Sequence, residues 1–226
     1  MSTNLNGYGI IWDMDGTMVD TMPIHLEVLT DFMTSQGLQF TEEDFIRTSG
    51  MPTIEIFKPY FPKASYEELH NLSLLKDAAF REKAEKVGIP FLPGVARLLQ
   101  QLKEAGFKQG IATGSPAKNL ELVFNSNPGS QNYFSGTVVA EDTKRGKPNP
   151  EVFLKAAEKL EIAPEKCLVI EDGTMGIEGA HRAGMRTIAY DPDLSRVELF
   201  KRTGATVVIQ TLEALSVDFI WKLLLS

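Results

Sequence analysis

The stretch IIWDMDGTMVD, residues 10–20, places an apolar run directly before three acidic residues. In an extended backbone, neighbouring side chains point to opposite sides, so Asp13 and Asp15 can face the same space while Met14 faces away. The glycine that follows lets the chain turn sharply. The stretch therefore predicts a buried strand that ends in a pair of carboxylates.

Five further β-rich runs follow, and helical patterns separate most of them: FKQGIAT, GTVVA, CLVIE, MRTIAY and TVVIQ. One helical segment, residues 94–105, carries four apolar residues on one face, namely Val95, Leu98, Leu99 and Leu102. Apolar strands that alternate with helices indicate a parallel sheet covered on both faces. We therefore predict an α/β fold with a doubly wound parallel sheet, that is, a Rossmann-like core.

Residues 21–88 break this alternation, because they show no convincing strand. Two capping-box patterns start helices there, a loose one in TEED and a good one in SYEE. The second helix, residues 66–87, ends at Gly88. The next segment, IPFLPG, is rich in Pro and Gly, as a hinge would be. We therefore predict an α-helical cap, residues 21–88, inserted after the first strand of an α/β catalytic core formed by residues 1–20 and 89–226.

Composition excludes several classes of protein. The 226 residues carry a net charge of −7, which argues against binding to a nucleic acid. The single cysteine, Cys167, excludes an intrachain disulfide and lies in an apolar run, where a buried thiol is expected. The N-terminus lacks a secretion signal, and no apolar stretch approaches the ~20 residues that span a bilayer. We expect a cytoplasmic protein without nucleic-acid or membrane partners, and make no prediction of its oligomeric state.

Polar residues follow four of the predicted strands. In open α/β sheets, ligands bind beyond the carboxyl ends of the strands, so residues at these ends meet in one crevice. The residues expected there are Asp13, Asp15, Thr113, Gly114, Ser115, Lys147, Glu171 and Asp172.

The four acids of this crevice need a cation. Carboxylates such as Asp13, Asp15, Glu171 and Asp172 repel each other by about 4 kcal/mol per pair at about 4 Å, for an effective dielectric constant near ~20. Oxygen ligands suit a hard cation, and Mg²⁺ uses one or two carboxylates alongside substrate phosphate. The sequence therefore predicts Mg²⁺ as the cofactor, with these four residues as candidate ligands.

The segment TGSPAKNLELVF predicts an anion site. Ser115 is a good N-cap and Pro116 a good first residue, so a helix is expected to begin at the strand end and to present free N–H groups to the crevice. Thr113 adds a hydroxyl, Gly114 lets an oxyanion approach the backbone, and Lys147 adds a positive charge. Together with Mg²⁺, these donors suit a phosphoryl group in transfer.

The first pair of acids suits covalent chemistry. A carboxylate can attack phosphorus to form an aspartyl phosphate, and a second carboxyl group can protonate the leaving oxygen and then deprotonate water. Asp13 and Asp15 fit these two roles. Asp20 and the pair Glu141-Asp142 fit structural roles, in a loop or at a helix start, better than catalytic ones.

Four motifs, in this order, resemble those of the haloacid dehalogenase superfamily. They are DMDGT at residues 13–17, Thr113 after an apolar strand, Lys147 in KPNP, and Glu171-Asp172 followed by Gly176-Ile177. The resemblance covers essentially the whole chain and includes the helical cap after the first motif, as in the β-phosphoglucomutase-like subgroup.

The resemblance implies roles for these residues. Asp13 would be the nucleophile, Asp15 the acid and base, and Thr113 and Lys147 the residues that stabilise the phosphoryl oxygens. It also implies four residues around Mg²⁺: Asp13, Asp15 through its backbone carbonyl, Asp172, and Glu171 in or next to the coordination shell. Members of the superfamily that cleave carbon–halogen or carbon–phosphorus bonds lack the second Asp of the first motif, so Asp15 favours phosphate esters.

The cap distinguishes two activities of the subgroup. Asp20-Thr21 and His25 stand where β-phosphoglucomutases have a similar Asp-Thr and His. The mutase cap also carries a Lys-Gly pair and an Arg three residues after the Gly, whereas SGMPT around Gly50 has neither cation, and Arg47 is out of register. His25, Arg47 and Gly50 are candidate substrate contacts from the cap, and His25 is equally consistent with packing.

The residues together favour a Mg²⁺-dependent phosphatase, a phosphoric monoester hydrolase that acts on a small phosphomonoester. The stretches LPGVARLL, EKCLVIED and DLSR resemble the pseudouridine 5′-phosphatase branch and point to a sugar or nucleotide-like phosphate. Two alternatives stay open: a β-phosphoglucomutase-type sugar-phosphate mutase, and a non-catalytic module that binds a phosphorylated metabolite.

Overall fold

A single parallel sheet forms the centre of the protein. The computed structural model describes residues 7–48 and 51–226, and its six strands have the order β3-β2-β1-β4-β5-β6. The strands are β1 (Gly9–Trp12), β2 (Lys108–Ala112), β3 (Gly136–Val138), β4 (Cys167–Glu171), β5 (Arg186–Tyr190) and β6 (Val207–Ile209). Each lies within one of the runs predicted from the sequence. The doubly wound α/β fold is confirmed.

The order of the strands reverses next to β1. The chain first builds outward on one side through β2 and β3, then returns to add β4, β5 and β6 on the other side. Trp12 pairs with Ile111 of β2 and with Ile170 of β4, so the chain leaves all three strands at the same level. This reversal is where open α/β sheets bind their ligands.

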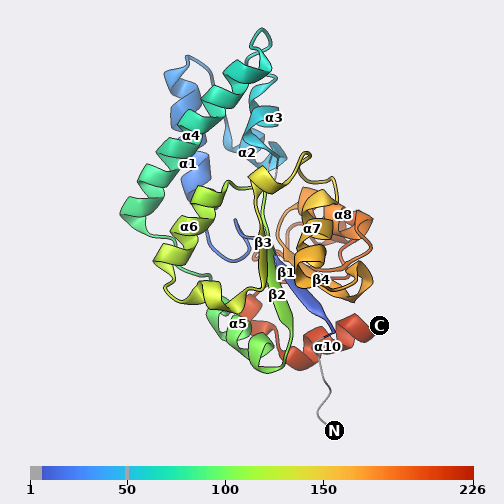
Figure 1. The fold of residues 1–226 in the computed structure, drawn as a ribbon. Coiled ribbons are helices and arrows are strands. Elements are labelled where there is room, and N and C mark those ends of the chain that lie inside the picture. The colour runs from blue at the N-terminus through green and yellow to red at the C-terminus, as the bar shows by residue number, and fades with distance from the viewer. Residues whose placement is uncertain (1–6, 49–50) are drawn as a thin grey trace.

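Helices cover both faces of the sheet (Figure 1). Side chains of α5 (Val95–Glu104), α6 (Ala117–Ser126) and α10 (Val217–Leu225) pack with Ile10 and Trp12 on one face. On the other face, α7 (Glu151–Leu160) and α8 (Thr174–Arg182) pack with Ile11, because successive strand residues alternate in direction. Around the sheet, the remaining elements are α9 (Val197–Thr203) and the 3-10 turns η1 (Ser130–Tyr133), η2 (Ala140–Asp142), η3 (Pro164–Lys166) and η4 (Leu212–Ala214).

The cap lies beyond the carboxyl ends of the strands, at the end of the molecule opposite the C-terminus (Figure 1). Its four helices are α1 (Met22–Ser35), α2 (Glu42–Thr48), α3 (Thr53–Phe57) and α4 (Tyr66–Val87). The good capping box is observed, since Ser65 and Glu68 bond to each other's backbone N–H groups. The cap has its own apolar cluster, formed by Leu29, Met33, Phe40, Ile56, Phe57 and Leu69.

The cap and the core are joined where the chain crosses between them. Val19, on the way into the cap, forms an antiparallel bridge with Phe91, on the way out. At the base of the cap, Ile24 of α1 and Phe80 of α4 belong to the apolar cluster of the core. A cap of residues 21–88 on a core of residues 1–20 and 89–226 remains our proposal for the domain boundaries.

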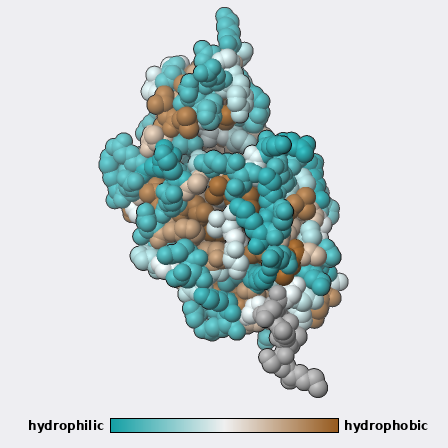
Figure 2. Space-filling view, viewed as in Figure 1, coloured by the Kyte–Doolittle hydropathy of each residue, from teal (hydrophilic) through white to brown (hydrophobic). Residues whose placement is uncertain are grey.

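The surface is largely hydrophilic in the view of Figure 2, and the single thiol is buried. Within residues 7–48 and 51–226, no helix is both long and apolar enough to cross a bilayer. Cys167 is fully buried, and burial, aided by the negative charge of Glu165, raises the pKa of its thiol to about 12. The prediction of a buried thiol is confirmed.

The cap cluster generates a test of cap stability. Phe57 is fully buried between Phe32 and Phe61, so the substitution Phe57→Ala should lower the free energy of unfolding by about 3–5 kcal/mol. Tyr66→Ala removes an aromatic ring that is 71% exposed and should change it by at most about 0.5 kcal/mol. Urea unfolding followed by circular dichroism measures both, and equal losses would contradict the packing described for α3.

Candidate active site

Residues from four segments meet at the carboxyl ends of the strands. Asp13 follows β1, Thr113 follows β2, Glu171 ends β4 and Asp172 comes next. Oxygen atoms of Asp13, Glu171 and Asp172 lie within 4.8 Å of one another. Lys147, from the loop before α7, lies against two of these acids.

The Lys147 ammonium group is buried between two carboxylates. Its Nζ donates a hydrogen bond to Oδ1 of Asp13 and another, of 2.7 Å, to Oε1 of Glu171. Burial alone would lower the pKa of Lys147, but the charges of Asp13 and Glu171 outweigh it and raise that pKa well above its ordinary value. The lysine therefore stays positively charged and neutralises part of the acidic cluster.

The pKa values of the acids show that one lysine does not balance them. Burial raises the pKa of Asp13 well above its usual value, although Lys147 partly offsets this effect. Burial and the neighbouring charge of Glu171 raise the pKa of Asp172 to about 7, and a 2.9 Å hydrogen bond from the Thr17 hydroxyl counteracts only part of the rise. Both pKa shifts disfavour the ionised carboxylates in the metal-free site, and a divalent cation would favour them.

The donor set fits a hard cation such as Mg²⁺. Glu171 has both carboxylate oxygens engaged, one by Lys147 and the other by the backbone N–H of Gly173 at 2.5 Å. Among the described residues, hydrogen bonds use only one oxygen of Asp13 and one of Asp172. Asp13 and Asp172 therefore each have an oxygen available to a metal. Both oxygens of Glu171 instead accept hydrogen bonds, from Lys147 and Gly173.

Asp15 lies in a polar environment of its own. Its carboxylate accepts hydrogen bonds of 2.6 Å from the hydroxyls of Thr21 and Ser115, and His25 Nε2 lies 3.5 Å away. Burial would raise the pKa of Asp15, but the interactions with His25, Ser115 and Thr21 outweigh it and lower that pKa to about 2. Asp15 is therefore an ionised carboxylate at neutral pH.

The predicted helix start at Ser115 is wrong. Pro116 has an extended backbone with ψ of 154°, so α6 begins only at Ala117, and the Ser115 hydroxyl bonds to Asp15 instead of capping the helix. The backbone N–H of Ala117 donates to the Glu141 carboxylate at 3.0 Å. Both carboxylates come from distant parts of the chain, and local sequence rules cannot include them. Glu141 thus has the structural role favoured from the sequence.

The three candidate cap contacts have different outcomes. His25 stacks on Phe80 with ring centroids 4.0 Å apart and also faces Asp15, so it combines packing with a site contact. Arg47 is exposed and pairs with Asp44 at 2.5 Å; no contact within the described residues joins it to the strand ends. Gly50 lies outside the described residues.

Lys76 of α4 is a buried cation that sequence reasoning missed. Its Nζ lies 3.2 Å from both His25 Nδ1 and Asp77 Oδ1. Burial and the charge of Lys76 lower the pKa of His25, whose ring lies between two groups, with Nδ1 toward Lys76 and Nε2 toward Asp15. A signal was available, because position 76 falls in the buried stripe of α4 with Leu69 and Phe80.

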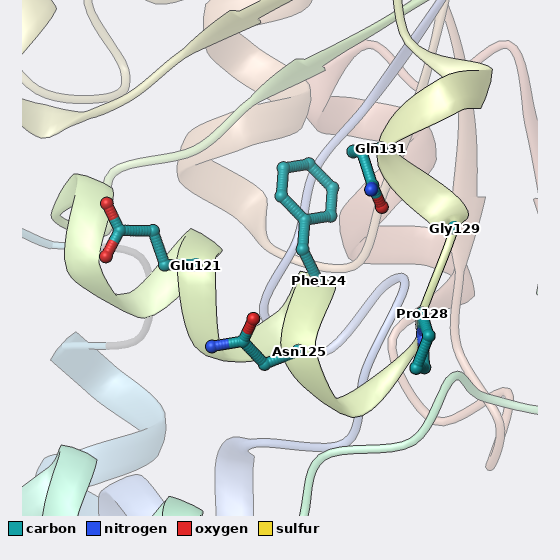
Figure 3. Close-up of a pocket in the computed structure, with 6 residues that line it drawn as sticks. All are labelled: Glu121, Phe124, Asn125, Pro128, Gly129 and Gln131. Carbon is teal, nitrogen blue, oxygen red and sulfur yellow. The ribbon is translucent and has the colours of Figure 1, made fainter.

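A surface hollow elsewhere does not suit a phosphate ester. It lies on α6 and the loop that follows, and Figure 3 shows its lining residues: Glu121, Phe124, Asn125, Pro128, Gly129 and Gln131. The lining contains one acidic side chain, no basic side chain and none of the strand-end residues. The strand ends remain the candidate site.

The raised pKa of Asp172 predicts pH-dependent metal binding. Below pH about 7 this carboxyl group is protonated in the metal-free site, and Mg²⁺ must displace the proton. We expect the affinity for Mg²⁺ to weaken about tenfold between about pH 8 and about pH 6. Calorimetric titration with MgCl₂ measures this change, and an affinity independent of pH over that interval would contradict it.

Gly16 provides a second test of the metal ligands. It has φ of 82°, and a Cβ atom at this position would overlap the Asp172 carboxylate. Gly16→Ala should therefore weaken Mg²⁺ binding by about tenfold or more. Gly37→Ala is the matched control, since Gly37 has φ of 72° and open space around it. Equal Mg²⁺ affinities of the two variants would show that Gly16 does not protect the position of Asp172.

Comparisons with known proteins identify the family of the chain. The family described as haloacid dehalogenase-like hydrolase matches residues 10–190. The phosphorylated carbohydrates phosphatase of Thermotoga maritima is 32% identical over 92% of this chain and 96% of its own length. The fructose-1-phosphate phosphatase of Escherichia coli is 31% identical over 80% of this chain and 94% of its own length. A β-phosphoglucomutase from Clostridium difficile, 24% identical, shares the fold with a TM-score of 0.85 over 96% of both chains. The resemblance noted in the sequence is confirmed, and the chain belongs to the haloacid dehalogenase-like hydrolase family.

Proposed function

We propose that this protein is a Mg²⁺-dependent phosphatase that hydrolyses a small phosphomonoester through an aspartyl phosphate on Asp13. The observation that carries the proposal is that Asp13, Lys147 and Asp172 meet at the carboxyl ends of the strands, with Asp15 two residues from Asp13. Asp13 belongs to the crowded acidic cluster beside Lys147, whereas Asp15 is ionised and hydrogen-bonded. The lowered pKa of Asp15 suits the step in which it accepts a proton from water, and Mg²⁺ beside Asp13 would favour the ionised carboxylate that attacks phosphorus.

The reaction proceeds in two balanced displacements. An Asp13 oxygen attacks phosphorus, the ester P–O bond breaks, and the leaving oxygen takes a proton from Asp15. Water then attacks the aspartyl phosphate, gives its proton to Asp15 and releases inorganic phosphate, which restores the Asp13 carboxylate. Asp13, Asp172 and the backbone carbonyl of Asp15 would hold Mg²⁺, which would supply positive charge to the phosphoryl oxygens.

Asp15 needs a different pKa in each of its two roles. In the free protein the pKa of Asp15 is about 2, so this residue is in the form that accepts a proton from water. Its acid role requires a higher pKa, and the negative charge of a bound phosphate ester raises it. His25, whose Nε2 lies 3.5 Å from the Asp15 carboxylate, links this carboxylate to Lys76 of the cap.

The remaining polar residues bind the phosphoryl group. Lys147 supplies a charge that is already held in place by two carboxylates, so little reorganisation is needed. Thr113 and Gly114 form the turn after β2, and Ser115 closes it with a 3.0 Å hydrogen bond from its N–H to the Thr113 hydroxyl. We assign the phosphate oxygens to this turn and not to the start of α6, where Glu141 already occupies the Ala117 N–H.

The substrate we propose is a phosphorylated carbohydrate. Two relatives that match most of this chain are named for phosphorylated carbohydrates and for fructose 1-phosphate. The cap covers the strand ends, so it excludes bulk water and selects the leaving group. Phosphatase activity is favoured over mutase activity, because the SGMPT stretch lacks the cations that would hold a second phosphate.

The nucleophile is tested by Asp13→Asn. This variant should lower phosphate release from a panel of sugar phosphates by about 10³-fold or more, because an amide oxygen does not form the aspartyl phosphate. Asp20→Asn, an exposed acid of the same loop, should retain activity. Each protein is measured with Mg²⁺ and with a chelator, and normal turnover by Asp13→Asn would refute the mechanism.

The same panel separates the alternatives. With glucose 1-phosphate, formation of an isomer faster than inorganic phosphate would assign a mutase. A protein that binds Mg²⁺ and phosphate analogues but turns over none of the esters would be a binding module.

A further inference from the structure

An ion pair outside the catalytic residues, between a buried aspartate and a partly exposed arginine, holds the loop that follows β5. Asp191, the first residue after β5, is 1% exposed. Its carboxylate accepts a 2.7 Å hydrogen bond from the backbone N–H of Arg196 and one of 3.2 Å from the Arg196 Nε. Leu194, inside the loop, has a left-handed backbone with φ of 53°. The chain therefore tolerates a strained residue to bring Arg196 back to Asp191.

The guanidinium group of Arg196 reaches from this loop to the candidate metal ligands. Its Nη1 donates a 3.1 Å hydrogen bond to the backbone carbonyl of Asp172. The group also lies over the ring of Phe200, 4.6 Å from the centroid, and Phe200 is fully buried. Three neighbours thus hold one planar cation, and through it the loop after β5 is tied to the residue after β4.

Asp172 is consequently held at two points. The Thr17 hydroxyl, from the loop after β1, fixes its carboxylate at 2.9 Å. Arg196, from the loop after β5, fixes its backbone carbonyl. Mg²⁺ demands nearly ideal ligand geometry, so a ligand whose side chain and backbone are both held binds it better than a free one.

We propose that Arg196, itself held by Asp191, is a positioning residue that orients Asp172 for Mg²⁺. This inference rests on the Mg²⁺ site of the proposed function. An ion pair with a buried member is a weak source of stability, because the cost of removing charge from water offsets much of the attraction. The geometry gives the pair a different use, since the same guanidinium that satisfies Asp191 also reaches the backbone of Asp172.

Removal of one partner alone would leave a buried charge, so two variants are needed. The double variant Asp191→Asn with Arg196→Met removes both charges together and keeps a similar volume. Arg196→Lys keeps the positive charge but lacks the planar set of donors that joins Asp191 and Asp172 at once. Arg202→Met is the matched control, because Arg202 is an exposed arginine of α9, the helix that begins directly after Arg196.

The experiment is calorimetric titration of each full-length protein with MgCl₂ in the absence of substrate. Circular dichroism in a chelator first establishes that each variant is folded. We expect the double variant and Arg196→Lys to bind Mg²⁺ about 10- to 100-fold more weakly than the wild type, and Arg202→Met to bind it as the wild type does. Phosphatase activity of the first two variants should return as the Mg²⁺ concentration is raised.

Two outcomes would overturn the inference. A folded double variant with wild-type Mg²⁺ affinity would show that the ion pair only closes the loop. Full affinity in Arg196→Lys would show that positive charge, and not the directed hydrogen bond, is what matters. A wild-type protein that binds no Mg²⁺ would instead refute the metal site itself, so failure of the proposed function is seen separately.

Discussion

The site depends on an imbalance of charge around one buried ammonium group. Lys147 is shared by Asp13 and Glu171, and Asp172 adds a third acid to the same few ångströms. One cation cannot neutralise three carboxylates in a buried environment, where their mutual repulsion is large. Burial, together with this surplus negative charge, raises the pKa values of Asp13 and Asp172, and the surplus charge suits a divalent cation.

The fold brings this charge together and at the same time separates Asp15 from it. Because β1 lies between β2 and β4, the residues that follow these strands leave the sheet side by side. Asp13 turns toward the acids after β4, whereas Asp15 bonds to Ser115 after β2 and to Thr21 at the start of the cap. Two acids separated by one residue therefore lie in different surroundings, and in the metal-free site the pKa of Asp13 is raised while that of Asp15 is lowered.

Much of the fold and part of the site could be predicted from the sequence. Strands and long helices are local patterns, and the helix over residues 66–87 has the bounds expected from its capping box and its terminal glycine. The start of α6 was mispredicted, because Asp15 takes the Ser115 hydroxyl and Glu141 caps the helix. Lys76 was overlooked because a lysine on a helix is usually solvated.

The sequence by itself determined the order of strands along the chain, the inserted helices and the identity of the strand-end residues, since each depends on side-chain type and spacing over a few positions. Only the tertiary structure decided which oxygen of each acid is engaged, which acid is ionised, and that Arg196 reaches Asp172. Those properties depend on distances between residues far apart in the chain and on burial from water, which local spacing does not encode.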